Sequence, residues 1–190
     1  EIKALKAQGK AALIMSIENA YCLGNELSLV EHYYNMGVRM IGLTHNGNNE
    51  LADAATDSIT EHGGLSGFGC RVIQEMNRLG IIVDVSHASR LACLLAVRIS
   101  ETPVIASHSG VYNLKSIPRN LTDEEMTAIA SRGGLIQISI GRYFLSTQPK
   151  SEVGLDHLIE HINYVVALVG IDHVGIGSDF DGGAGVNGCE

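Results

Sequence analysis

The stretch IIVDVSHAS at residues 81–89 closely resembles the stretch PVIASHSGV at residues 103–111. Each is an apolar run that ends in Ser-His and continues into small residues. Runs that are rich in β-branched residues and apolar on both faces are typical of strands in a parallel sheet. The two stretches therefore predict buried neighbouring strands that each end on a histidine, at His87 and at His108.

Six such runs alternate with segments of helical periodicity. The runs cover residues 11–17, 38–44, 80–86, 102–107, 134–140 and 172–178. Between them, a helical apolar stripe is followed by Gly80 as the expected C-cap, and Thr122 and Glu125 form a capping-box pattern. A long amphipathic helix is expected to end at Gly170. This β-α order, repeated about six times, predicts an α/β fold with a parallel sheet, either doubly wound or a (β/α)8 TIM barrel.

Composition excludes several classes of function. The chain has 190 residues and a formal net charge of −8, without a basic stripe, so no nucleic-acid partner is expected. No apolar stretch approaches the roughly 20 residues of a membrane span, and no membrane contact is predicted from this segment. The cysteines Cys22, Cys70, Cys93 and Cys189 form no CxxC pair and are interpreted as ordinary thiols. Residues 1–190 are expected to form a single, partial barrel domain.

Five of the six runs are followed by, or end on, an ionisable residue. These residues are Glu18, His45, His87, His108 and Asp179. In a parallel barrel the carboxyl ends of all strands meet on one face, which carries the active site, whereas an open sheet spreads them along a line. Convergence of the five residues therefore favours the barrel over the doubly wound sheet.

Taken singly, each of these residues has an ordinary structural interpretation, such as a helix cap or a hydrogen-bonded surface histidine. The other histidines are assigned to that class: His32, His62, His157, His161 and His173. His157 and His161 stand four residues apart on a predicted helix, but they follow no strand and lack a metalloprotease HExxH pattern. We expect them to lie on a solvated helix face.

The five strand-end residues together allow a specific chemistry. Two imidazoles and one carboxylate, from Glu18, His87 and His108, form a three-ligand set of the kind that catalytic zinc uses. Asp179 could exchange protons with water and the leaving group, and His45 could polarise a carbonyl. Arg119, in SIPRNLTD, is the expected cation for a substrate carboxylate because its planar fork binds carboxylates bidentately.

The sequence resembles the membrane (renal) dipeptidase family, the M19 metallopeptidases of the amidohydrolase-like barrels. The matching stretches are SIE, GLTHNGNN, GLSGFGCRVIQEMNRLGIIVDVSHAS, PVIASHSGVYNLKSIPRNLTDEEM and VGIGSDFDGG, in this order between about residues 12 and 183. Any one of them alone would be a weak signal. The ordered set is highly specific and covers most of the chain.

This resemblance implies a zinc-dependent dipeptidase that hydrolyses dipeptides, some with a D-residue at the C-terminal position, by attack of a metal-bridging hydroxide. It implies that Glu18 bridges two zinc ions and that His87 and His108 complete the ligands of one of them. It further implies that His45 contacts the scissile carbonyl, that Arg119 binds the substrate carboxylate and that Asp179 is the general acid/base.

Two departures from the family pattern stand out. The family glutamate is usually followed by two glycines, whereas Asn19 and Ala20 follow Glu18 here. The first family strand ends in a His-x-Asp pair that supplies ligands to the other zinc, and no histidine of this chain has Asp two residues later. We therefore expect about six of eight β/α units, with the first and last missing. For residues 1–190 alone we expect weak binding of one metal and slow turnover.

Two other functions remain open at this stage. One is a different amidohydrolase-type metal hydrolase, against which Arg119 speaks because it suits a substrate with a free carboxylate. The other is a truncated or degenerate barrel that acts as a non-catalytic binding module, which the absent His-x-Asp pair favours. The resemblance makes a homodimer possible, while localisation, cytoplasmic or exported, stays open.

Overall fold

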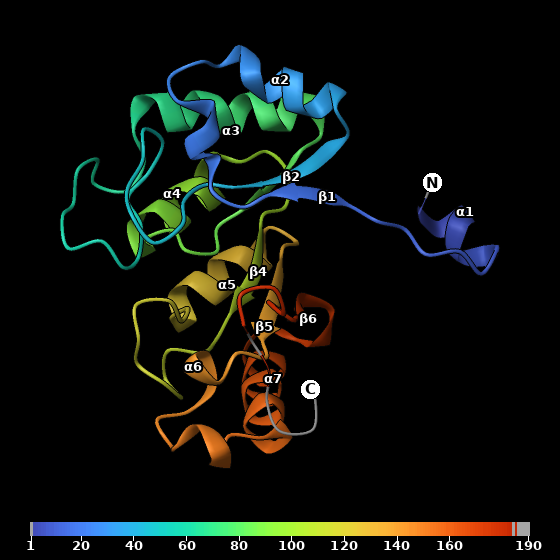
Figure 1. The fold of residues 1–190 in the computed structure, drawn as a ribbon, viewed down its shortest axis with the longest axis vertical. Coiled ribbons are helices and arrows are strands. Elements are labelled where there is room, and N and C mark those ends of the chain that lie inside the picture. The colour runs from blue at the N-terminus through green and yellow to red at the C-terminus, as the bar shows by residue number, and fades with distance from the viewer. Residues whose placement is uncertain (1, 184, 186–190) are drawn as a thin grey trace.

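The computed structural model describes residues 2–183 and 185 and contains one sheet of six parallel strands (Figure 1). Each of the six apolar runs contributes one strand, as the sequence predicts. The strands are β1 (Met15–Ile17), β2 (Val38–Gly42), β3 (Ile82–Asp84), β4 (Ile105–Ser109), β5 (Leu135–Ser139) and β6 (Val174–Gly177).

The strands lie side by side in chain order, from β1 to β6, and every neighbouring pair is parallel. A doubly wound sheet reverses its strand order at a switch point, whereas a (β/α)8 barrel keeps the order of the chain. The order therefore has the topology of a barrel. The prediction of an incomplete barrel is confirmed, and the six strands bring all carboxyl ends to one edge.

Helices connect the strands. They are α1 (Ile2–Ala7), α2 (Ser28–Asn35), α3 (Gly67–Leu79), α4 (Arg90–Ile99), α5 (Asp123–Ser131), α6 (Arg142–Leu145) and α7 (Leu155–Val169), with 3-10 turns η1 (Ala20–Leu23), η2 (Lys150–Glu152) and η3 (Ile171–His173). Figure 1 shows α1 standing apart from the rest, at the end of an extended segment that leads into β1. Among the described helices, none has the length and apolar character that crossing a membrane requires.

Local capping signals set the helix ends. Gly80 adopts a left-handed conformation with φ of 80° at the end of α3, as predicted. The capping box at the start of α5 is also present, because the Thr122 side chain accepts from the Glu125 backbone and the Glu125 carboxylate accepts from Thr122 in return. The long helix α7 ends at Val169, directly before the predicted Gly170.

The core lies between the sheet and the helices that cover it. Its largest fully buried side chains include Ile41, Ile136 and Ile138 from the strands and Ile73, Met76, Met126 and Ile129 from the helices. Burial of apolar surface on this scale is the dominant favourable term in folding. The packed layer fixes where each strand ends, and so it also fixes where the strand-end side chains lie.

The cysteines in the described residues are free thiols. Cys93 is buried, Cys70 is half-buried and Cys22 is exposed. Burial raises the pKa of the Cys93 thiol well above its ordinary value, with the nearby Glu125 charge adding to the shift. Cys93 is therefore an unreactive part of the core. The predicted thiol at Cys189 lies outside the described residues.

The prediction that His161 lies on a solvated helix face is wrong. Its side chain is fully buried on α7, where Nδ1 accepts from the Val111 backbone N–H at 3.0 Å and Nε2 lies 3.0 Å from the Leu145 carbonyl oxygen. His157 is half-buried, and its Nδ1 accepts from the Gly154 N–H at the start of α7. His161 thus joins the loop after β4 to the end of α6, because a buried polar side chain needs hydrogen-bond partners.

We predict that His161→Ala lowers the free energy of unfolding by about 3 kcal/mol, because it leaves the Val111 N–H and the Leu145 carbonyl buried without partners. His157→Ala is the matched control on the same helix and should cost less than about 1 kcal/mol, since it removes one partly exposed cap bond. Urea denaturation of both variants measures the difference. Equal stabilities of the two variants would contradict this role of His161.

Candidate metal centre

The predicted strand-end residues gather at the carboxyl edge of the sheet. Glu18 follows β1, His45 lies three residues after β2, His87 lies three residues after β3, and His108 is the fourth residue of β4. Asp179 lies two residues after β6. In parallel strands that run in chain order, side chains at these positions point toward one region.

Three side-chain atoms from three strands converge at one point. The Glu18 Oε1 atom lies 3.0 Å from His87 Nε2 and 3.2 Å from His108 Nε2. The two Nε2 atoms lie 3.0 Å from each other. Glu18 is half-exposed, while both imidazoles are buried. The three atoms therefore form a compact triangle that is open on the side of Glu18.

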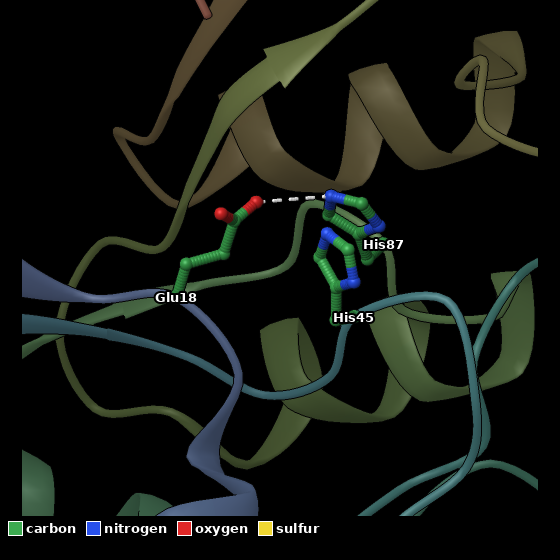
Figure 2. Close-up of side chains that lie close together, drawn as sticks. All are labelled: Glu18, His45 and His87. Carbon is green, nitrogen blue, oxygen red and sulfur yellow. Dashed lines mark ion pairs between the residues drawn. The ribbon is translucent and has the colours of Figure 1, made fainter. Parts of the chain in front are cut away.

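His45 lies against the same group. Its ring centroid is 4.2 Å from that of His87, with 34° between the planes. Figure 2 shows the two imidazoles side by side, with the Glu18 carboxylate pointing at His87. Ligand atoms of Glu18, His45 and His87 all lie within 4.8 Å of one another. Four potential ligand residues thus surround one region.

The convergence has an electrostatic consequence. A carboxylate oxygen only accepts, and a neutral imidazole carries one hydrogen on one of its two nitrogens. Three such atoms at 3.0 to 3.2 Å repel one another unless a hydrogen on an imidazole nitrogen or a cation lies between them. A tetrahedral zinc ion with bonds of about 2.0 to 2.1 Å sets its ligand atoms roughly 3.3 Å apart. The triangle therefore fits one such ion in both donor chemistry and spacing.

The protonation states also suit a metal. Contacts with the imidazoles of His108 and then of His87 hold the pKa of the Glu18 carboxyl well below its usual range. Burial lowers the pKa of His87 to about 4, against an opposing contribution from Glu18. At neutral pH, Glu18 is therefore a carboxylate and His87 a neutral imidazole, which are the forms that bind metal ions.

Arg119 is buried and donates from Nη2 to the His108 backbone oxygen at 3.3 Å. Its guanidinium lies 5.2 Å from the centre of the Phe144 ring. Burial lowers its pKa to about 10, although the charges of Asp84, Asp179 and Glu18 oppose the shift, so the side chain stays cationic at neutral pH. Arg119 and His87 line the same cavity, of about 470 Å³. A fixed positive charge therefore faces the space beside the triangle.

Asp179 faces the triangle from the other end of the sheet. It lines a cavity of about 280 Å³ together with Glu18 and His108, and a second one of about 360 Å³ with His45 and His87. Burial raises the pKa of Asp179, and the charges of Glu18 and Asp181 add to the shift. A carboxyl group with a raised pKa beside a polar cavity is suited to proton exchange.

Backbone strain is concentrated at this edge. Among the described residues, the non-glycine residues with positive φ are Asn19 at 74°, His87 at 68° and Asp179 at 54°. Such conformations are costly for residues other than glycine and occur often at functional sites. Two of the three are predicted site residues, and Asn19 directly follows a third, Glu18.

The strain also explains one departure noted above. Asn19 occupies a position where the backbone favours glycine, and asparagine tolerates such positions better than most residues. Its Oδ1 accepts from the Tyr21 backbone N–H at 3.2 Å and from Asn49 Nδ2 at 3.1 Å. Asn19 can therefore replace a glycine here because its side-chain hydrogen bonds offset the strain.

Sequence reasoning missed two residues of the site. Asp84 and Ser107 line the same cavity as Glu18 and His108. Asp84 is buried, and it is the only charged residue within the run at residues 80–86. A single charged residue in an apolar run was the sequence signal for Asp84, since a buried carboxylate needs hydrogen-bond or charged partners.

A parallel barrel sheet that gathers imidazoles and carboxylates at the carboxyl ends of its strands is the arrangement of metal-dependent hydrolases. Comparison with known proteins agrees: residues 1–190 match the family described as membrane dipeptidase, peptidase family M19. The chain belongs to this family.

Related sequences include an uncharacterised dipeptidase of Schizosaccharomyces pombe, 38% identical over 184 residues, and dipeptidase aclJ of Aspergillus oryzae, 36% identical over 174 residues. These alignments cover 95% and 92% of this chain but 44% and 41% of the relatives. The chain therefore spans less than half the length of these curated relatives.

Two solved structures are similar. One is the probable dipeptidase PvdM from Pseudomonas aeruginosa, with a TM-score of 0.92 and 32% identity over 98% of this chain and 62% of that one. The other is a metallopeptidase from Rhodobacter sphaeroides bound to a phosphinate mimic of the dipeptide L-Ala-D-Ala, with a TM-score of 0.89 and 28% identity over 98% of this chain and 55% of that one. Both support the barrel topology.

We predict that Asn19→Ala lowers the free energy of unfolding by about 2 kcal/mol, because it loses two side-chain hydrogen bonds and keeps the strained φ. Asn19→Gly is the matched variant. It loses the same bonds but relieves the strain, so we expect a change of less than about 1 kcal/mol. Thermal unfolding of the two variants measures both values. A similar loss for glycine and alanine would contradict the strain argument.

Proposed function

We propose that this chain carries the zinc-binding and catalytic edge of a dipeptidase. The observation that supports the proposal most is the triangle of Glu18 Oε1, His87 Nε2 and His108 Nε2, whose spacing suits one zinc ion. Membership of the membrane dipeptidase family supports a peptide substrate. The second zinc of the intact site would share Glu18 and take its remaining ligands from a His-x-Asp pair, which this chain does not contain.

The residues have separate roles in this proposal. Glu18, His87 and His108 hold the metal, which when bound supplies a Lewis acid and lowers the pKa of water toward neutrality. Asp179, protonated more readily than an ordinary aspartate, transfers a proton to the leaving amine. His45 lies against His87, and its proposed role is to contact the carbonyl oxygen of the scissile bond.

Arg119 determines the class of substrate. Its charge faces the cavity that it shares with His87, so a C-terminal carboxylate bound there would lie beside the triangle. A dipeptide has its carboxylate one residue from the scissile bond, which matches this short separation. The solved relative that binds a mimic of L-Ala-D-Ala is the basis for proposing that a D-residue is accepted at the C-terminal position.

We predict that His87→Ala and His108→Ala each abolish stoichiometric zinc binding, because each removes one of three converging ligands. His157→Ala is the control, since His157 lies on α7 away from the triangle, and it should bind zinc like the parent. Metal content after zinc reconstitution and dialysis measures this. Parent-like zinc content in the His87 or His108 variant would refute the assignment.

The dipeptidase proposal predicts discrimination between a free carboxylate and an amide. A dipeptide should be hydrolysed with kcat/KM at least about tenfold above that of its C-terminal amide, because a charge-assisted contact to Arg119 is lost in the amide. Arg119→Lys, which keeps the charge without the bidentate fork, should reduce this ratio. The assay uses zinc-loaded chain and a longer protein that contains it. Hydrolysis of neither compound by either protein would overturn the proposal.

A further inference from the structure

The carboxylate of Asp84 is fixed between two strands. On β3, it accepts from the Ser86 backbone N–H at 3.0 Å and from the Ser107 backbone N–H of β4 at 3.0 Å, both through Oδ1. Its other oxygen, Oδ2, accepts from the Ser107 hydroxyl at 2.5 Å. Asp84 is buried, and its negative charge is the largest of the charge contributions that stabilise the Arg119 guanidinium. Both carboxylate oxygens thus have donors.

The Ser107 hydroxyl is also in contact with His108. Its oxygen lies 2.8 Å from His108 Nδ1 and 3.3 Å from the Ser86 hydroxyl oxygen. A serine hydroxyl has a single hydrogen, and a carboxylate cannot donate. The shorter, charge-assisted bond takes that hydrogen to Asp84. The remaining contact requires His108 Nδ1 to be the donor to Ser107.

We propose that Asp84, acting through the Ser107 hydroxyl, is a positioning residue that fixes neutral His108 in the Nδ1–H tautomer and so leaves its Nε2 lone pair free for the metal. This proposal rests on the zinc site proposed above. Ligand histidines in metal sites commonly donate their second nitrogen to an acceptor that orients the ring. Here the acceptor is the Ser107 hydroxyl, and the Asp84 carboxylate in turn accepts from that hydroxyl.

The two proposed ligand histidines therefore differ in which ring nitrogen carries the hydrogen. In this tautomer His108 Nε2 carries no hydrogen, so the hydrogen inside the triangle of the metal-free chain is on His87 Nε2, which lies 3.0 Å from both Glu18 Oε1 and His108 Nε2. His87 Nδ1 is buried and has no hydrogen-bond partner among the described residues. His87 must move its proton to Nδ1 to bind a metal ion, whereas His108 is already in the binding form.

The two hydrogen bonds from His108 Nδ1 to Ser107 and from Ser107 to Asp84 form a relay. The isosteric substitution Asp84→Asn reverses the direction of both bonds. An asparagine Oδ1 can still accept from Ser86 and Ser107, but its Nδ2 donates to the Ser107 hydroxyl oxygen. Ser107 then donates its hydrogen to His108 Nδ1, which places the His108 hydrogen on Nε2, the metal-binding atom. Nitrogen NMR of the histidine rings in the metal-free chain, above neutral pH, reports the tautomer directly.

The experiment compares the parent with Asp84→Asn, Ser107→Ala and Ser109→Ala. We expect His108 Nδ1–H in the parent and Nε2–H in Asp84→Asn, with zinc affinity 10- to 100-fold weaker by chelator competition. Ser107→Ala removes the hydroxyl without reversing the hydrogen bonds, so it should weaken zinc binding less than Asp84→Asn does. It also tests the same contact if Asp84→Asn does not fold.

Ser109→Ala is the control. Ser109 is buried on the same strand and its hydroxyl has no partner among the described residues, so this variant should bind zinc like the parent.

The outcomes separate the two proposals. An unchanged His108 tautomer together with unchanged zinc affinity in Asp84→Asn would overturn the relay. So would parent-like zinc affinity in Ser107→Ala if the asparagine variant does not fold. A parent that shows His108 Nδ1–H but binds no zinc would support the relay while refuting the metal site.

Discussion

Three potential ligand atoms that converge at one spot are the constraint on which this edge of the protein depends. Glu18, His87 and His108 come from the ends of β1, β3 and β4 of a parallel sheet, and their ligand atoms lie 3.0 to 3.2 Å apart. Without a cation, only a hydrogen on an imidazole nitrogen relieves the repulsion between these atoms, so the surrounding fold has to hold them in place. Next to them, the buried Asp84 and the half-buried Ser107 join β3 to β4 through hydrogen bonds to backbone and side chain alike. Stability and site geometry are therefore coupled at this point.

The strained backbone is the second cost of the arrangement. The chain changes direction sharply after β3 and after β6, where His87 and Asp179 adopt positive φ. Glycine would relieve this strain but would remove the imidazole or the carboxyl group at that position. Asn19 has more freedom and uses its amide to stabilise the turn. The strain is tolerated because the packed core determines the conformation on both sides of each turn.

Much of this could be predicted from the order of residues alone. Strands and their ends follow from the spacing of apolar runs, and in parallel sheets position along the strand determines which residues meet. Glu18, His87 and His108 were accessible to that reasoning. The burial of His161 was not, since it depends on how α7 packs against a loop fifty positions earlier. The Asp84–Ser107 contact could not be predicted from the sequence either. It depends on the pairing register of β3 and β4, with Asp84 opposite Ile105, which is a property of the folded sheet.

The positions of the strands within the sheet have a consequence for local motion. β3 and β4, which lead to His87 and carry His108, have neighbours on both sides in the sheet. Strands in the middle of a packed sheet open only at high free energies, so their amide hydrogens exchange slowly with solvent. The two imidazoles therefore sit on the slowly exchanging part of the sheet.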